Sequence, residues 1–335
     1  MEKWLIPLNE EERLRLSDSF NNVSSKTLLV DFSSRVYIIR DLMDLKDDDD
    51  SFELLLCGMM CFYGCVLLSI SQFGEIRNVN DLFKFTALYL YVDHYLDNIS
   101  VSIEEKKKVL SKMKSVLINP KRLSDEDCLE ISEYERRRLI FATDMLVDLI
   151  EKYDILNDLK NVFYFQVKGL QIQGRKDYSE EEYIEILEKS SYSVFAIQSI
   201  LGGSKTEKEY QIGRCVQLID DFVDVYKDMD EGINTYATYC LKRDGILDNY
   251  INYMNTQIDK LYCSYNAVKP FMYGIIAYCV TKHKDISVEL KQDLQRYSII
   301  DHSTGVQARQ LFIRWLKEEI EEHEKETGEQ WLKRT

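Results

Sequence analysis

Residues Gln217 to Asp228 read Q-L-I-D-D-F-V-D-V-Y-K-D, and this stretch decides how the rest of the chain is interpreted. At about 3.6 residues per helical turn, its apolar residues fall on one half of a helix and its acidic residues on the other. Asp220, Asp224 and Asp228 are spaced i, i+4, i+8, so their side chains stack on successive turns. The pattern predicts one helix over residues 207–228 with an acidic row on its polar face.

The composition of the chain predicts an all-α protein. Its 335 residues include only 3 prolines and 13 glycines, and apolar residues recur at helical spacing in most segments. No internal repeat, Pro- or Gly-rich linker or composition break divides the chain, so we expect a single large helical domain over residues 1–335. Residues 1–50 form an N-terminal segment in this interpretation, and residues 305–335 carry a charged amphipathic helix.

Charge and cysteine usage narrow the partners and the compartment. A formal net charge of −15 argues against nucleic acid, which is bound by clustered Lys and Arg. An anionic ligand would therefore be held by metal ions or by a local basic pocket. Eight cysteines in a long chain that opens without a signal-peptide pattern predict reduced thiols and a cytoplasmic location.

Residues 54–74 contain no charged side chain and are long enough to cross a bilayer. Glycine, serine, glutamine and three cysteines dilute the stretch, and the chain offers no second span to partner it. We therefore expect a central helix buried on all sides of the bundle, and no stable membrane span.

A second acidic pair, Asp93 and Asp97, lies in the sequence L-Y-L-Y-V-D-H-Y-L-D-N. The other positions of this helix, predicted over residues 81–98, are apolar or aromatic on nearly every side, so the helix should be buried. Buried ionised carboxylates need a cation, a salt bridge or a raised pKa. Two acidic rows on separate helices indicate a two-sided site for a divalent metal such as Mg²⁺, which prefers carboxylate oxygens. An ordinary acidic solvent face is the alternative for the 220–228 row.

The segment D-D-F-V-D-V-Y-K-D resembles the second metal-binding motif of class I terpene synthases, (N/D)-D-x-x-(S/T)-x-x-x-E. The resemblance implies that Asp220, Asp224 and Asp228 are the three metal ligands and that Lys227 binds diphosphate. Asp224 stands where Ser or Thr is commoner and Asp228 where Glu is commoner, but both keep an oxygen donor. Asp221 becomes a flanking residue.

The same segment, with Gln217 included, also resembles the F-Q-x-x-D-D-x-x-D motif of trans-prenyl diphosphate synthases. Lys189-Ser190 resembles the Lys-Thr diphosphate contact of that family. The stretch from Asp93 to Asp97 is similar to its D-D-x-x-D motif, with His94 in the second place. Chain elongation also needs a cationic G-K-x-x-R-P pocket, and residues 50–75 contain no Lys or Arg, which favours a terpene synthase.

The resemblance implies further basic groups that hold diphosphate, and Lys189 and Arg175 are candidates. Terpene synthases carry an Arg-Tyr pair near the end of the domain, and Arg296-Tyr297 has that dipeptide. Alternatively, F-M-Y-G-I-I-A-Y-C-V-T-K-H-K resembles the helix before the pair, which puts Lys284 in the Arg position and Asp285 in the Tyr position. A solvated surface charge is the alternative for each of these residues.

The class I isoprenoid synthase resemblance implies a single helical bundle around a central cavity. It also implies a lyase that ionises a prenyl diphosphate, here farnesyl diphosphate, releases diphosphate and cyclises the carbocation to a sesquiterpene. Three Mg²⁺ ions, replaceable by Mn²⁺, assist departure of the leaving group. A monomer or a homodimer fits this family. The alternatives are a trans-prenyl diphosphate synthase and a non-catalytic helical interaction protein.

Overall fold

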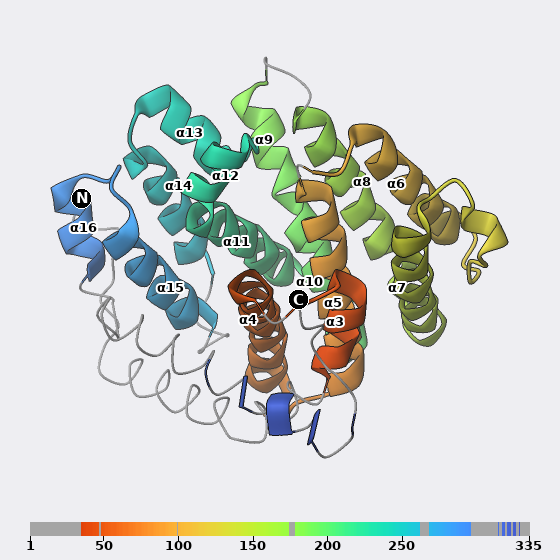
Figure 1. Cartoon of the computed structure of the whole chain (residues 1–335). Helices are drawn as coiled ribbons and strands as arrows, with labels where there is room; N and C mark the ends of the chain where they lie inside the picture. The colour runs from red at the N-terminus through yellow and green to blue at the C-terminus, as the bar shows by residue number, and fades with distance from the viewer. Residues whose placement is uncertain are drawn as a thin grey trace. The chain divides into compact units, whose positions relative to one another are not determined.

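The computed structural model describes five continuous stretches of the chain and scattered positions between 314 and 328 (Figure 1). The stretches are residues 35–46, 48–98, 100–173, 178–261 and 268–295. These residues form helices and contain no β-strand, so the prediction of an all-α protein is confirmed. The central cavity and the isoprenoid-synthase-like arrangement stay predictions.

The chain divides into two compact units. Unit 1 is built on Ile70–Gly74 and Asn157–Gly305, and unit 2 on Asn21–Ser69 and Glu75–Leu156. The single domain expected over residues 1–335 stays a prediction. Residues 1–34 lie outside the described part, while the described positions between 314 and 325, in the expected C-terminal helix, are helical.

Unit 2 contains a group of packed helices in which α3, α5 and α7 contact one another and α6 packs on α7. Two serines begin helices here: the Ser102 hydroxyl accepts from the Glu105 amide, and the Ser132 hydroxyl accepts from the Glu135 amide. The elements are α3 (Val36–Met43), α5 (Val79–Asp97), α6 (Ile103–Ile118), the short η1 (Glu126–Cys128) and α7 (Glu133–Lys152).

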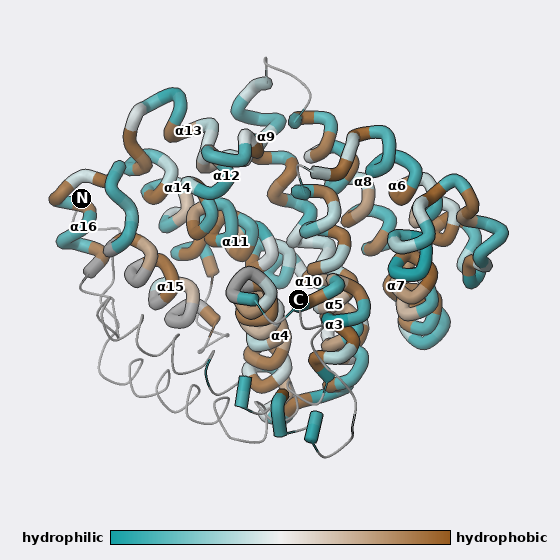
Figure 2. The backbone as a smooth tube through the Cα atoms, viewed as in Figure 1, coloured by the Kyte–Doolittle hydropathy of each residue, from teal (hydrophilic) through white to brown (hydrophobic). Residues whose placement is uncertain are grey.

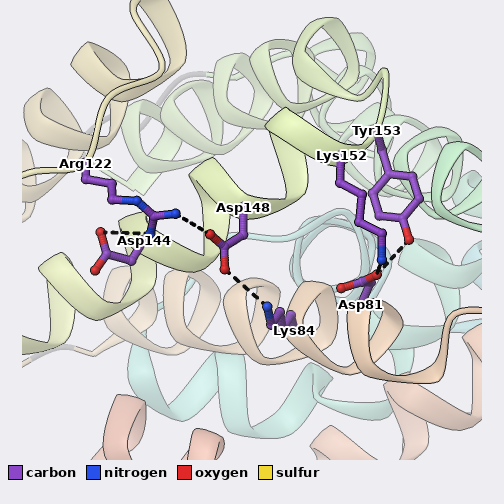
Figure 3. Close-up of polar contacts among 7 residues, drawn as sticks. All are labelled: Asp81, Lys84, Arg122, Asp144, Asp148, Lys152 and Tyr153. Carbon is purple, nitrogen blue, oxygen red and sulfur yellow. Dashed lines mark hydrogen bonds and ion pairs between the residues drawn. The ribbon is translucent and has the colours of Figure 1, made fainter.

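Ion pairs tie α5 to α7 within unit 2 (Figure 3). Asp81, near the start of α5, accepts hydrogen bonds from Lys152 Nζ and, at 2.7 Å, from Tyr153 Oη. Lys84, one turn further on, donates to Asp148 of α7 at 3.2 Å. Burial raises the pKa of Asp81, but the hydrogen bonds from Lys152 and Tyr153 and the nearby positive charges outweigh it, so the pKa lies below its ordinary value.

Helix α4 (Asp49–Phe73) is the long apolar helix expected from the sequence, and its apolar residues are brown in Figure 2. Leu54–Phe73 has a mean hydropathy of 2.1, and 56% of its apolar window is buried. In the described part of the chain, α4 is the one helix long and apolar enough to cross a membrane. The core helix of a soluble protein can meet the same criterion. The prediction of burial on all sides is wrong, because Cys57, Met60 and Cys61 are exposed along one face.

Unit 1 holds the aspartate segment and the helices around it. Ser179 opens α9 with a capping box, and Gly202 ends α10 in the left-handed conformation at φ 73°. The elements are α8 (Leu156–Gln173), α9 (Glu180–Ile186), α10 (Glu188–Leu201), α11 (Glu207–Val223), α12 (Val225–Glu231), α13 (Tyr236–Asp244), α14 (Asp248–Asp259), α15 (Val268–Lys282) and α16 (Val288–Gln295).

Helices α10 and α11 lie directly against each other within unit 1 (Figure 1). At Gly213 the two backbones touch: a Cβ placed there would lie 2.3 Å from Ser191 Cα and 2.4 Å from Ser190 O. The Ser191 hydroxyl donates to the Tyr210 carbonyl across the same contact at 2.8 Å. Only glycine permits this approach, which fixes the start of α10 against the middle of α11.

The C-terminal half of α11 is held by α14 and α15. Phe222 stacks on Tyr250 of α14 at 6.3 Å between ring centroids, and the Tyr250 hydroxyl donates to the Leu218 carbonyl at 2.5 Å. His283, directly after α15, meets the Phe222 ring edge-on at 4.5 Å. The end of the helix that carries the aspartates is therefore packed from two sides.

Candidate functional site

The aspartate segment is two helices, and the prediction of one continuous helix over residues 207–228 is wrong. Helix α11 ends at Val223 and α12 begins at Val225, with Asp224 between them at φ −98° and ψ 4°. The spacing of the acidic row nevertheless survives. The Asp224 amide donates to the Asp220 carbonyl at 3.1 Å, and the Asp228 amide donates to the Asp224 carbonyl at 2.8 Å. The three aspartates therefore follow one another at intervals of one turn across the break.

The acidic row runs from solvent into the protein. Asp220 and Lys227 are exposed, Asp224 is half-buried, and Asp228 is only 8% exposed. Asp221 is buried as well, at 7% exposed. A solvated acidic face would keep all of its carboxylates in water, so this alternative describes only part of the segment.

A chain of hydrogen bonds links α10 to two of these aspartates. The Ser190 hydroxyl donates to Gln217 Oε1 at 2.7 Å. Gln217 Nε2 in turn lies 2.9 Å from Asp221 Oδ1 and 3.3 Å from Asp220 Oδ2. Lys189, beside Ser190, is 8% exposed, so both residues of the predicted Lys-Ser contact lie at this buried interface.

Gln217 and Asp221 are the residues that sequence reasoning undervalued. The motif resemblance gives Asp221 a flanking position and Gln217 only a place in the motif. Their spacing of i, i+4 on one helix face was the available signal, since such pairs commonly share a hydrogen bond. In the structure they orient the carboxyl groups at the start of the acidic row.

The end of α15 docks on α12. The backbone amides of Lys284 and Asp285 donate to the Tyr226 hydroxyl at 3.0 and 3.1 Å, and Lys284 Nζ lies 5.5 Å from the centre of the Tyr226 ring. Of the two candidate C-terminal pairs, Lys284-Asp285 is thus brought onto the aspartate segment. Arg296-Tyr297 lies outside the described residues, as does Arg175.

The first acidic motif lies at the end of α5 in unit 2. Tyr95 and Leu96 are buried as predicted, but Asp93 is only half-buried, and His94 and Asp97 are exposed. The prediction that these carboxylates are buried, and so need a cation, a salt bridge or a raised pKa, is therefore wrong, because the last turn of α5 reaches solvent. Asp93 and Asp97 belong to unit 2 and the 220–228 row to unit 1, so the two-sided metal site stays a prediction.

The acidic row offers oxygen donors but does not by itself form a complete metal-binding group. Among the described residues, no group of three or more His, Cys, Asp or Glu side chains is arranged to hold a metal ion alone. Mg²⁺ commonly takes one or two carboxylates and fills its shell with water and substrate phosphate. Asp220, Asp224 and Asp228 offer oxygen donors of this kind, with the solvent side at Asp220.

The chain was also compared with known proteins. No protein-family model, no curated protein and no solved structure matches it. The function proposed below rests on the motif resemblance and on the geometry of unit 1.

Proposed function

We propose that this chain is a class I terpene synthase that ionises a prenyl diphosphate, with farnesyl diphosphate as the first substrate to test. One observation carries the proposal. Within unit 1, the lysine-bearing start of α10, the aspartate segment and the end of α15 are joined by hydrogen bonds through Gln217 and Tyr226. The start of α10 and the residues after α15 therefore each contact the aspartate segment, although they are far apart in the sequence, and this supports the proposal.

Each residue of the proposed site has a role that its chemistry suits. The carboxylates of Asp220, Asp224 and Asp228 hold the metal, and the ammonium groups of Lys227 and Lys284 neutralise diphosphate oxygens. Both lysines are exposed in the structure and can reach a ligand that approaches from solvent. Mg²⁺, when bound, stabilises the negative charge that develops on the departing diphosphate.

Lys189 and the first acidic motif complete the proposed site. Lys189 is buried beside Ser190 and would meet the diphosphate from the α10 side. Asp93 and Asp97 are assigned to metal binding by resemblance alone, and both side chains reach solvent.

One specific observation favours a trans-prenyl diphosphate synthase as the second candidate. Ser190, Gln217 and Asp221 are hydrogen-bonded in series, and these are the residues that match the Lys-Thr and F-Q-x-x-D-D motifs of that family. Against it, residues 50–75, where that family carries its second cationic pocket, have no Lys or Arg. The terpene synthase therefore remains the first proposal.

Incubation of the purified chain with Mg²⁺ and the C10, C15 and C20 prenyl diphosphates tests both candidates. Terpene synthesis predicts a hydrocarbon or terpene alcohol by gas chromatography, with release of diphosphate that does not need isopentenyl diphosphate. A lengthened prenyl diphosphate formed only in the presence of isopentenyl diphosphate would support the second candidate. No product and no diphosphate release from any substrate would refute both and leave the non-catalytic interaction protein.

A further inference from the structure

His283 is a buried imidazole next to the break in the aspartate segment. It is 4% exposed, and its Nε2 lies 2.7 Å from the carbonyl oxygen of Phe222. Its ring meets the ring of Phe222 at 4.5 Å and that of Tyr226 at 5.0 Å, in each case edge-on. Its Nδ1 is buried and has no hydrogen-bond partner among the described residues.

The hydrogen bond to Phe222 determines which ring nitrogen carries the proton. A carbonyl oxygen only accepts, so Nε2 must donate, and in the neutral ring Nδ1 is then an acceptor. In an uninterrupted α-helix the Phe222 carbonyl would accept from the amide four residues later, that of Tyr226. The imidazole thus supplies this carbonyl with a donor from outside the helix, at the turn where α11 gives way to α12.

The residues that follow His283 hold the other side of the break. The amides of Lys284 and Asp285 both donate to the Tyr226 hydroxyl. His283, Lys284 and Asp285 therefore hydrogen-bond to Phe222 and Tyr226, which lie two positions before and two positions after Asp224. Simple packing of an aromatic ring would not require a donor on the first of these and two donors on the second.

We propose that His283 is a positioning residue that holds the helix break at Asp224 and so sets the direction of the Asp224 and Asp228 carboxylates. The mechanical part of this inference concerns the backbone of residues 222–228 and is independent of any reaction. Its functional part rests on the proposed diphosphate site, because the carboxylates that it orients are the proposed metal ligands. Loss of the imidazole donor would let the segment relax toward a continuous helix and turn these carboxylates away from their present directions.

Two substitutions at residue 283 separate a donor from a packed ring. His283→Gln keeps an N–H donor at a reach similar to Nε2 but removes the ring. His283→Phe keeps the edge-on ring contacts but removes the donor. If donation matters, the Gln variant resembles the wild type and the Phe variant does not, whereas a packing role gives the reverse order.

The first readout is amide hydrogen exchange of the full chain without substrate, followed in peptides that cover residues 222–231. One hydrogen bond is worth about 1 kcal/mol, so exchange in His283→Phe should depart from the wild type by about five- to tenfold. His283→Gln should stay within about twofold, a margin well below the effect of one hydrogen bond. Wild-type exchange in His283→Phe, or an equal change in both variants, would overturn the proposal.

A second variant covers the case in which His283→Phe does not fold. Tyr226→Phe removes the hydroxyl that accepts from Lys284 and Asp285 and leaves the imidazole in place. Tyr226→Phe should change the amide exchange rates of the same peptides. Unchanged rates would contradict the proposal that hydrogen bonds hold the chain on both sides of Asp224.

The functional readout uses Mg²⁺ with inorganic diphosphate in a calorimetric titration of the wild type and both variants at residue 283. Weaker binding by His283→Phe, restored in His283→Gln, supports positioning of the ligands. Binding by His283→Phe equal to that of the wild type overturns the functional part. If the wild type itself binds neither ion, the proposed function fails while the exchange result still decides the mechanical part.

Discussion

Gly213→Ala would place a side-chain carbon between two helix backbones. The added Cβ would lie 2.3 Å from Ser191 Cα and 2.4 Å from Ser190 O, and both are backbone atoms that no rotamer change can move. Carbon atoms in ordinary contact are about 3.5–4.0 Å apart, so α10 and α11 would have to separate by about 1 Å or more at this point. This separation would also lengthen or break the hydrogen bond between Ser190 and Gln217.

The expected destabilisation follows from three contributions. Overpacking of a tight contact costs about 1–3 kcal/mol. Loss of the two hydrogen bonds across the crossing, from Ser191 to Tyr210 and from Ser190 to Gln217, costs about 1 kcal/mol each. The better helix propensity of alanine offsets about 1 kcal/mol of this cost, so the free energy of unfolding should fall by about 2–4 kcal/mol.

Urea denaturation followed by circular dichroism measures this loss, and Gly64→Ala is the matched control. Gly64 lies within α4, and nothing comes within 4 Å of a Cβ built there, so alanine should be neutral or stabilise by up to about 1 kcal/mol. An unfolding midpoint for Gly213→Ala equal to or above that of the wild type would refute the close crossing of α10 and α11. An equal fall of the unfolding midpoint in both variants would mean that the loss does not come from the contact between α10 and α11.

Three further predictions concern charged residues. Because the pKa of Asp81 is lowered in the folded protein, its contribution to stability is complete above the ordinary value of 3.8 and is lost as the pH falls through the lower folded value. Urea unfolding from about pH 7 down to about pH 3 should therefore show an acid-dependent loss in the wild type that is smaller in Asp81→Asn. Asp220→Ala should abolish turnover with a change in unfolding free energy below about 1 kcal/mol, because the side chain is exposed, and the exposed Asp230→Ala is its control for turnover. Lys284→Ala should raise the KM for the prenyl diphosphate about tenfold, which corresponds to a loss of roughly 1.4 kcal/mol of binding free energy. The control Lys160→Ala, on the exposed face of α8, should leave the KM unchanged. Equal KM values in both variants would remove Lys284 from the site.

Helix positions were predictable because their signals are local. Ser102 and Ser132 stand immediately before α6 and α7, and each hydroxyl accepts a backbone amide as an N-cap should. Gly202 ends α10 in a conformation that other residues rarely adopt. The expected helix over residues 81–98 is observed at Val79–Asp97, within two residues at each end.

The features that the sequence did not predict depend on distant partners. The break at Asp224 lies beside a carbonyl that accepts a hydrogen bond from His283, 61 positions from Phe222, and no local pattern reports that contact. The predicted burial of the last turn of α5 was wrong for a related reason. Periodicity identifies the face of a helix but not the turn at which the helix leaves the core, so Asp97 was expected inside and lies outside.

The two acidic motifs differ in how strongly the fold fixes them, and this decides what their mutants can report. Asp97 is exposed on the last turn of α5, and Asp93 beside it is half-buried, so substitutions there change little packing and should alter stability by less than about 1 kcal/mol. Gln217 and Asp221 are buried and hydrogen-bonded to each other and, through Ser190, to α10. Removing either loses a buried hydrogen bond, which costs about 1 kcal/mol before any function is lost. A loss of activity at Asp93 or Asp97 would therefore report directly on metal or substrate binding, whereas a loss at Gln217 or Asp221 has to be corrected for unfolding before it bears on the reaction.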